Sequence, residues 1–388
     1  MITFILILLS LIQTLKLRGI FFFEIYLGFV AFFNILKIVF RKKSIELRNN
    51  GFILNNIIFV VILILSFIAN VYNCVEVGNW SLFITLVFSF LVSKYISKVN
   101  VQTDKIIEMC ILSSIFLFIT LIIEKIFNFE LTALSGVMIE PNISASYFAS
   151  LLIILIAYSW INNYFNKSLY IVIIVLGLLF SVTRSSWIAL SLAFIIYFIF
   201  RILFYKKNTN RSYVNKKGYL KPIIFLASLL IIILIAVSFY NLNELFRYKI
   251  QNIFNFSSGT GYFRSYMNKQ AINEILNNKF YLRGTSSFGL NFDYSTSLSG
   301  LNSTQAYLPN LYLLFFFDLG IIGGSLFILF FIGIFIRALK QIFILKELNL
   351  IIVFLGILVL AISYYATNAI WFPQIWILIG IINRKNIY

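Results

Sequence analysis

Histidine is absent from this 388-residue chain, cysteine occurs twice, and acidic residues number only 13. Without histidine, any candidate site lacks the commonest general base and the commonest transition-metal ligand. Cys74 and Cys110 do not form a CxxC pair, so neither a disulfide framework nor a zinc site is expected. We therefore expect no cofactor and no bound metal, and a base would have to be a carboxylate or a tyrosine.

Charged residues are also scarce, at 11% against 61% hydrophobic residues, and the mean hydropathy is +0.97. A soluble domain carries about 25% charged residues, so this composition excludes that class. Several apolar runs approach or reach the length of a membrane-spanning helix. The first run, residues 2–15, lacks a basic leading segment and a small-residue cleavage site, so we expect a retained helix rather than a signal peptide.

The apolar runs predict an all-α polytopic membrane protein of about 12 transmembrane helices. Residues 1–388 are expected to form a single integral membrane domain. The expected spans are residues 2–15, 20–40, 52–72, 80–97, 106–123, 144–160, 168–183, 186–205, 222–242, 310–336, 350–367 and 371–383.

Basic residues gather after the second, fourth, eighth, tenth and twelfth spans. The positive-inside rule places these connections, and both termini, in the cytoplasm. The net charge of +18 is thus explained by topology and by attraction to anionic lipid headgroups, without nucleic acid as a partner. The clusters are Arg41, Lys42, Lys43, Arg48; Lys94, Lys98, Lys105; six residues within 206–221; Arg337, Lys340, Lys346; and Arg384, Lys385.

The long connection is residues 243–308, between spans nine and ten, and this topology places it outside. A structureless loop of this length is unusual, so we expect it to carry structure and function of its own. Apolar residues at helical spacing predict an amphipathic helix over 263–280, lying on the membrane surface. Residues 283–304, rich in Gly, Ser, Thr and Asn, read as a flexible or substrate-wrapping loop.

Arg184 lies in the short outer connection between spans seven and eight, among serines and a threonine. One interpretation is that its guanidinium extends to headgroup phosphates. The other is a functional anion site, because charges at the membrane edge often mark one.

Four motifs resemble, in order, those of the bacterial O-antigen polymerase (Wzy-type) and O-antigen ligase superfamily. They are "MIEPNISASYFASLL" (138–152), "FSVTRSSWIALSLAFIIYF" (180–198), "SSGTGYFRSYMNKQAINEILNNKFYLRGTSSFG" (257–289) and "YLPNLYLLFFFDLGIIGG" (307–324). The resemblance covers about residues 138–340. One departure is Pro309, which stands where the ligases commonly have histidine, and this favours the polymerase branch.

The resemblance implies glycosyl transfer at the outer leaflet of the bacterial cytoplasmic membrane. Its substrate would be an oligosaccharide on undecaprenyl diphosphate, and a chain-length regulator and a flippase would be candidate partners. The expected function is an O-antigen or capsule polymerase, acting without a metal. The alternatives are a ligase or O-oligosaccharyltransferase of the same superfamily and, in another class, a lipid-linked oligosaccharide flippase. A purely structural partner of a glycan assembly complex is a further alternative. Against the flippase, the spans show no internal repeat.

Arginines at the motif positions are the expected contacts of the departing diphosphate, since a guanidinium holds two phosphate oxygens and stays charged. Arg184 and Arg264 are the first candidates by their motif positions. Arg283 is the third, beside a glycine-containing turn, and its alternative is a solvated loop charge.

The remaining candidates are two carboxylates, two amides and one ring. Glu140 and Asp318 are the candidate bases; the alternatives are capping for Glu140 and a hydrogen-bonded partner inside the bundle for Asp318. Asn142 and Asn310 are candidates for binding sugar hydroxyls, although helix N-capping explains both. Tyr266 is a candidate for stacking on a sugar ring, with interfacial anchoring as the alternative.

Overall fold

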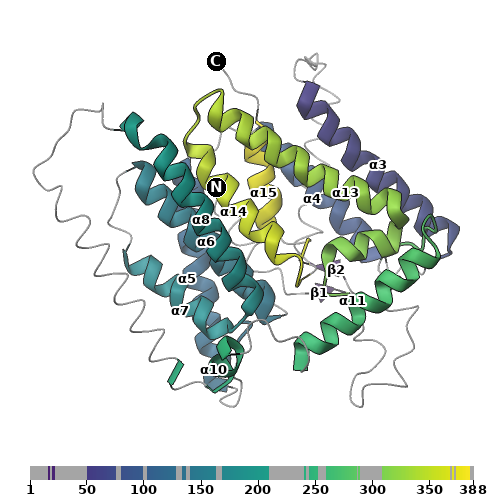
Figure 1. The fold of residues 1–388 in the computed structure, drawn as a ribbon, viewed down its shortest axis with the longest axis horizontal. Helices are drawn as coiled ribbons and strands as arrows, with labels where there is room; N and C mark the ends of the chain where they lie inside the picture. The colour runs from purple at the N-terminus through teal and green to yellow at the C-terminus, as the bar shows by residue number, and fades with distance from the viewer. Residues whose placement is uncertain are drawn as a thin grey trace, which may run out of the picture. The chain divides into compact units, whose positions relative to one another are not determined.

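In the described part of the chain, the regular structure is helical, apart from one pair of two-residue strands (Figure 1). The helices form two compact units. The computed structural model describes residues 16–17, 20–21, 50–75, 80–98, 103–127, 133–136, 140–162, 168–208, 240–241, 244–251, 259–285, 287–288, 308–367, 369–370 and 373–384.

The two strands correct one expected span. β1 (Lys16–Leu17) pairs antiparallel with β2 (Ile20–Phe21), with Lys16 opposite Phe21 and Leu17 opposite Ile20. The prediction that a helix starts at residue 20 is therefore wrong, because Ile20 and Phe21 are in extended pairing. The expected span 2–15, and most of the spans 20–40 and 222–242, lie outside the described residues.

Unit 1 is built around α6, which packs against four other helices of the unit: α5, α7, α8 and α14. Small residues let these backbones approach closely, and Ala145, Ala149 and Ser150 of α6 are fully buried. The Ser150 hydroxyl donates a hydrogen bond of 3.0 Å to the Gly356 carbonyl of α14. The helices of unit 1 are α5 (Thr103–Phe127), α6 (Pro141–Asn162), α7 (Ser168–Ser181), α8 (Arg184–Asn208), α10 (Glu244–Gln251) and α14 (Asn349–Ser363).

Unit 2 has an aromatic core at the meeting point of four helices. The ring of Phe59 lies 5.0 Å from Phe90, 4.9 Å from Phe330 and 5.1 Å from Trp376, between ring centroids. These rings join α3, α4, α13 and α15, while α11 packs on α13. The helices of unit 2 are α3 (Asn50–Tyr72), α4 (Ser81–Lys98), α11 (Gly259–Asn277), α13 (Leu311–Phe343) and α15 (Pro373–Ile382).

Among the described residues, five helices are long and apolar enough to cross a bilayer, so the chain is a multi-pass helical membrane protein. They are Leu54–Tyr72, Cys110–Phe127, Pro141–Ile161, Arg184–Phe204 and Leu311–Phe343. α15 has 10 residues, hence a length of about 15 Å against about 30 Å of hydrocarbon. The number of twelve spans therefore stays a prediction.

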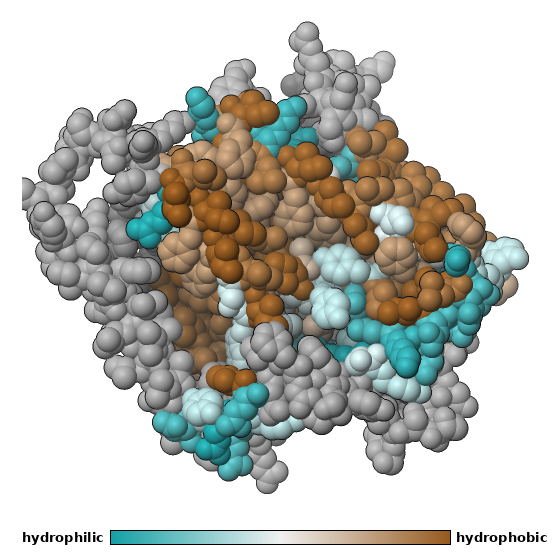
Figure 2. Space-filling view, in the orientation of Figure 1, coloured by the Kyte–Doolittle hydropathy of each residue, from teal (hydrophilic) through white to brown (hydrophobic). Residues whose placement is uncertain are grey.

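The outward faces of α3, α8 and α13 carry rows of exposed Ile, Leu, Val and Phe. Figure 2 shows apolar side chains over α8 and α13 and hydrophilic ones over α11. Exposed apolar rows of this extent are expected where a helix faces lipid, and they would be unusual on a soluble monomer.

Candidate active site

Arg184 is the first residue of α8 and follows a tight turn from α7. The turn passes through Val182, whose φ is 45° and whose N–H donates to the Leu179 carbonyl at 3.1 Å. The short connection expected between spans seven and eight is confirmed. The Arg184 side chain is half-buried there.

A chain of hydroxyls joins the start of α8 to the start of α6. The Thr183 hydroxyl donates to the Ser186 hydroxyl at 3.1 Å, and Ser186 Oγ lies 3.4 Å from Ser146 Oγ in α6. The N-terminal ends of the two helices therefore lie side by side. Ser185 precedes Ser186 in the sequence. Its Oγ is buried and has no hydrogen-bond partner among the described residues.

This arrangement favours an anion. The first turn of each helix has backbone N–H groups without a partner inside the helix, and the helix dipole adds positive potential. Residues 141–144 and 184–187 are uncharged apart from Arg184. A guanidinium and the positive ends of two helices all attract negative charge, so a bound anion would stabilise both Arg184 and the helix ends.

Glu140 and Asn142 flank the first residue of α6, Pro141. The Glu140 carbonyl accepts the N–H groups of Ile143 at 3.1 Å and Ser144 at 3.3 Å, so Glu140 holds the capping position. Asn142 lies one residue inside the helix. The N-cap interpretation of Asn142 is therefore wrong, because Pro141 takes the first helical position that suits its fixed φ.

Glu124, near the end of α5, contacts the segment that precedes α6, and the sequence did not single it out. Its carboxylate accepts the N–H groups of Ser135 at 2.8 Å and Gly136 at 2.5 Å. Ser144 of α6 donates to the Ser135 carbonyl at 2.5 Å. A lone carboxylate near the end of an apolar run was the available signal. Glu124 therefore holds residues 135–136 against α5, and Ser144 holds them against α6.

In unit 2, α13 is broken at Gly320, whose φ of 65° and ψ of −173° are not helical. The break frees the Asp318 carbonyl, which accepts the N–H groups of Arg283 at 2.9 Å and Gly284 at 3.1 Å. The Ile321 N–H donates to the Lys279 carbonyl at 2.9 Å. The segment that follows α11 is thus hydrogen-bonded to the break in α13.

The Asp318 side chain is bound in the same network. Its Oδ1 accepts the Ser287 hydroxyl at 2.9 Å and the Ser287 N–H at 3.3 Å, and Asp318 is only 2% exposed. This agrees with the alternative of a hydrogen-bonded partner in the bundle. Residues 283–285 and 287–288 are buried, so the flexible-loop prediction is wrong for this part of 283–304.

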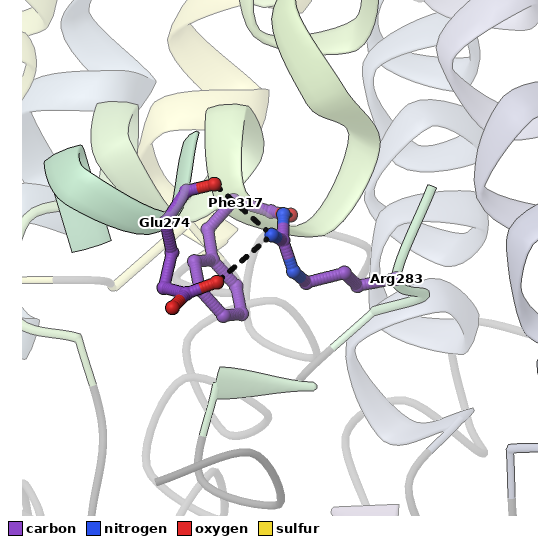
Figure 3. A network of polar contacts seen from close by, with 3 residues as sticks. All are labelled: Glu274, Arg283 and Phe317. Atoms are coloured by element: carbon purple, nitrogen blue, oxygen red, sulfur yellow. Dashed lines mark hydrogen bonds and ion pairs between the residues drawn. The ribbon is translucent and has the colours of Figure 1, made fainter. Parts of the chain in front are cut away.

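Arg283 is buried in a polar network (Figure 3). Its Nη2 lies 3.4 Å from Glu274 Oε2 and donates to the Glu274 carbonyl at 3.2 Å, while Nη1 donates to the Phe317 carbonyl at 3.2 Å. The guanidinium carbon lies 4.5 Å from the centre of the Phe317 ring. The alternative of a solvated loop charge is therefore wrong. A role in substrate binding stays a prediction.

Asn70 of α3 and Asn73, directly after α3, were not predicted as site residues, and they hold the same segment. Asn70 Oδ1 accepts the Thr285 N–H at 2.7 Å. Asn73 Nδ2 donates to the Leu282 carbonyl at 2.5 Å, and its Oδ1 accepts the Tyr281 hydroxyl at 3.0 Å. Amides in the last turn of an apolar run were the available signal.

The helix expected over 263–280 is present as α11, with bounds Gly259–Asn277. Met267, Ala271 and Ile275 form its buried face, and α11 packs on α13, whereas Ile272 and Leu276 are exposed. The expected single apolar face is therefore divided, and its placement on the membrane stays a prediction. Arg264 and Tyr266 are both half-buried on this helix.

Asn310 caps α13, as the sequence indicated. Its Oδ1 accepts the N–H groups of Tyr312 at 3.0 Å and Leu313 at 3.2 Å. The amide oxygen is thereby engaged with the helix, and contact with a sugar hydroxyl stays a prediction.

The predicted site residues fall into two groups. Arg184, Glu140 and Asn142 lie at the N-terminal ends of α6 and α8 in unit 1. Asp318 and Arg283 are joined through the break in α13, and Arg264, Tyr266 and Asn310 also belong to unit 2. The joint action of Arg184 and Arg264 on one substrate stays a prediction.

Comparison with known proteins finds a family match over part of the chain. No curated protein matches the chain. The O-antigen ligase family matches residues 169–328, which contain α7, α8, α11 and the break in α13. Arg184, Arg264, Arg283 and Asp318 lie inside this stretch, while Glu140 and Asn142 precede it. Through residues 169–328, the resemblance of the chain to the O-antigen polymerase and ligase superfamily is confirmed.

Proposed function

We propose that the chain is a glycosyltransferase that polymerises lipid-linked oligosaccharides at the outer leaflet of the bacterial cytoplasmic membrane. The donor is a glycan on undecaprenyl diphosphate, and the acceptor is the next lipid-linked repeat unit. The observation that carries the proposal is the position of Arg184 where the starts of α6 and α8 meet. The family match supports the same class of substrate.

The reaction places negative charge where this site is positive. A hydroxyl of the acceptor unit attacks the anomeric carbon, a new carbon–oxygen bond forms, and the bond to the diphosphate breaks. The electron pair of that bond leaves with the lipid diphosphate, and the hydroxyl proton passes to a base. The Arg184 guanidinium and the backbone N–H groups at the starts of α6 and α8 stabilise the negative charge that grows on the diphosphate in the transition state.

Glu140 and Asp318 suit different roles in this reaction. Glu140 is half-buried at the start of α6, whose first turns adjoin those of α8, so we assign it the base. The carboxylate of Asp318 already accepts two hydrogen bonds from Ser287, so we assign it a positioning role. Arg264, on α11, is the second candidate for the diphosphate.

The test compares two arginines of one helix. In a deletion strain, Arg184→Ala should reduce glycan chain extension by at least about 100-fold, because it removes a charge-stabilising donor from the transition state. Arg184→Lys should recover part of the activity. The matched control is Arg201→Ala on α8, whose exposed side chain lies more than four turns away and should leave extension unchanged. Full extension by Arg184→Ala, at normal membrane levels, would refute the proposal.

A ligase is the second candidate, because the matching family is described as O-antigen ligase. The two functions predict different glycans in the deletion strain. A polymerase leaves single repeat units on the lipid carrier, whereas a ligase leaves long chains on the carrier that fail to reach their acceptor. Single units trapped on the inner leaflet would point to a flippase.

A further inference from the structure

Cations from two helices gather in unit 2, at the end of α13 opposite to Asp318. Lys94 and Lys98 come from the last turns of α4, and Arg337 comes from α13. Arg337 and the turn that carries Lys94 both contact the end of α15, and Lys98 follows one turn after Lys94. Like charges held together raise the local potential and favour a polyanionic ligand.

The cluster is fixed by the end of α15. Arg337 Nε donates to the Ile382 carbonyl at 3.1 Å, and its Nη2 donates to the Arg384 carbonyl at 3.3 Å. α4 and α15 touch closely, since a Cβ on Gly380 would lie 2.7 Å from both the Ser93 carbonyl oxygen and Ile96 Cβ. The turn of α4 that carries Lys94 therefore packs directly against α15.

Two buried acceptors lie in the same place. Gln341 Nε2 donates to the Ile382 carbonyl at 3.2 Å, the same oxygen that Arg337 uses. Gln341 Oε1 and Asn383 Oδ1 have no hydrogen-bond partner in the described part of the chain, and the two residues are 7% and 5% exposed. A buried acceptor without a donor is unfavourable, so a ligand that brings hydrogen-bond donors would stabilise this end of the unit.

We propose that this cluster is a binding site for the headgroup of an anionic phospholipid with free hydroxyls, namely phosphatidylglycerol. Its phosphate interacts with Lys94 and Lys98, and its glycerol hydroxyls donate to Gln341 Oε1 and Asn383 Oδ1. The site goes beyond the general attraction of basic loops to anionic lipid, because it recognises a particular headgroup. It is independent of the glycosyl-transfer proposal.

The charge requirement is tested by lipid titration of the full-length protein in phosphatidylcholine nanodiscs or in detergent, read by native mass spectrometry. Lys98→Gln should weaken phosphatidylglycerol binding about fivefold, the effect of one cation near an anionic surface. The matched control is Lys105→Gln, an equal loss of charge at an exposed position of α5. Equal weakening by the two variants would indicate general electrostatics and overturn the proposal.

The hydroxyl requirement is tested without a change of charge. Asn383→Leu should weaken phosphatidylglycerol binding by about threefold to tenfold and leave phosphatidic acid, which lacks the glycerol headgroup and its alcohol hydroxyls, unaffected. Gln341→Met serves as the second variant if Asn383→Leu does not elute as a single folded species. Equal loss for both lipids would overturn the proposal. Glycerol 3-phosphate alone should not raise the melting temperature; a rise as large as with the lipid would assign the site to a soluble phosphate.

Discussion

Arg184 and Arg283 are both arginines of the family-like motifs, but their surroundings differ. The Arg283 side chain is 6% exposed and binds Glu274 and the Phe317 carbonyl, so its positive charge is compensated by groups within the protein. Arg184 is half-buried at the start of α8, beside the start of α6. A substitution of Arg283 should therefore affect folding first, whereas a substitution of Arg184 should affect chemistry first.

Arg283→Met should lower the free energy of unfolding by about 2–3 kcal/mol, because it removes three hydrogen bonds of a buried cation. Thermal or denaturant unfolding of the purified protein measures the loss. The control is Arg247→Met, whose partner Glu244 is 3.9 Å away with 93% of its side chain exposed. Such a pair contributes about 0–1 kcal/mol, so stability should hardly change. Similar losses in both variants would contradict the assignment of Arg283.

Glu140→Gln and Asp318→Asn separate a base from a positioning carboxylate. Loss of a general base lowers rates by about 100-fold to 10,000-fold, so Glu140→Gln should nearly abolish chain extension and remove its dependence on pH. Asp318→Asn retains an acceptor oxygen for Ser287, so extension should fall by less than about tenfold with an unchanged pH profile. Extension assays in membrane vesicles over a range of pH measure both. A larger loss in Asp318→Asn would reverse the two roles.

At the level of helices, the sequence predicts position well and local detail poorly. Long apolar runs located helices such as α3, α6 and α13 because a membrane-spanning helix needs about 20 apolar residues. The sequence could not show which glycine breaks α13, since Gly320, Gly323 and Gly324 all fit a helix–helix contact and only Gly320 has a positive φ there.

The hydrogen-bond network around Arg283 could not be predicted from the sequence for a related reason. Arg283 binds Glu274 of α11 and Phe317 of α13, while the nearby Thr285 binds Asn70 of α3, and no periodic pattern links these three helices. The strand pair at residues 16–21 was also missed, because two-residue strands carry no periodicity. Resemblance to a family pointed to Arg283 and Asp318. Only the structure shows that the Arg283 N–H donates to the Asp318 carbonyl at the break in α13.

Gly320→Ala tests the break in α13. The φ of 65° with ψ of −173° belongs to a region that is essentially restricted to glycine, and a Cβ would lie 3.0 Å from the Lys279 carbonyl oxygen. We expect a loss of stability of about 1–3 kcal/mol and weaker chain extension, because Arg283 and Ser287 depend on the same turn. Ser325→Ala, in the regular helix just beyond, is the control. Unchanged stability of Gly320→Ala in an unfolding experiment would show that the break is dispensable.

Over the whole molecule, the charge distribution and the apolar helices together define a multi-pass membrane protein, while the side that each end faces is a prediction. That topology places the residues after α3 outside, and it places Arg184 on the same side because four helices lie between them. The two cysteines make the prediction testable without a reporter fusion. Cys74 is exposed just after α3, and Cys110 is buried in α5.

In intact cells, a membrane-impermeant maleimide should label Cys74 in a Cys110→Ala background, because the thiol is exposed on the outer side. Lys105→Cys, in a chain without the two native cysteines, should be labelled only after the membrane is permeabilised, since this residue belongs to a predicted cytoplasmic connection. The reverse labelling pattern would show that the orientation of the chain in the membrane is opposite to the predicted one. Arg184 would then face the cytoplasm, the family-like site could not reach a substrate in the outer leaflet, and the proposed polymerase reaction would have to be abandoned together with the orientation.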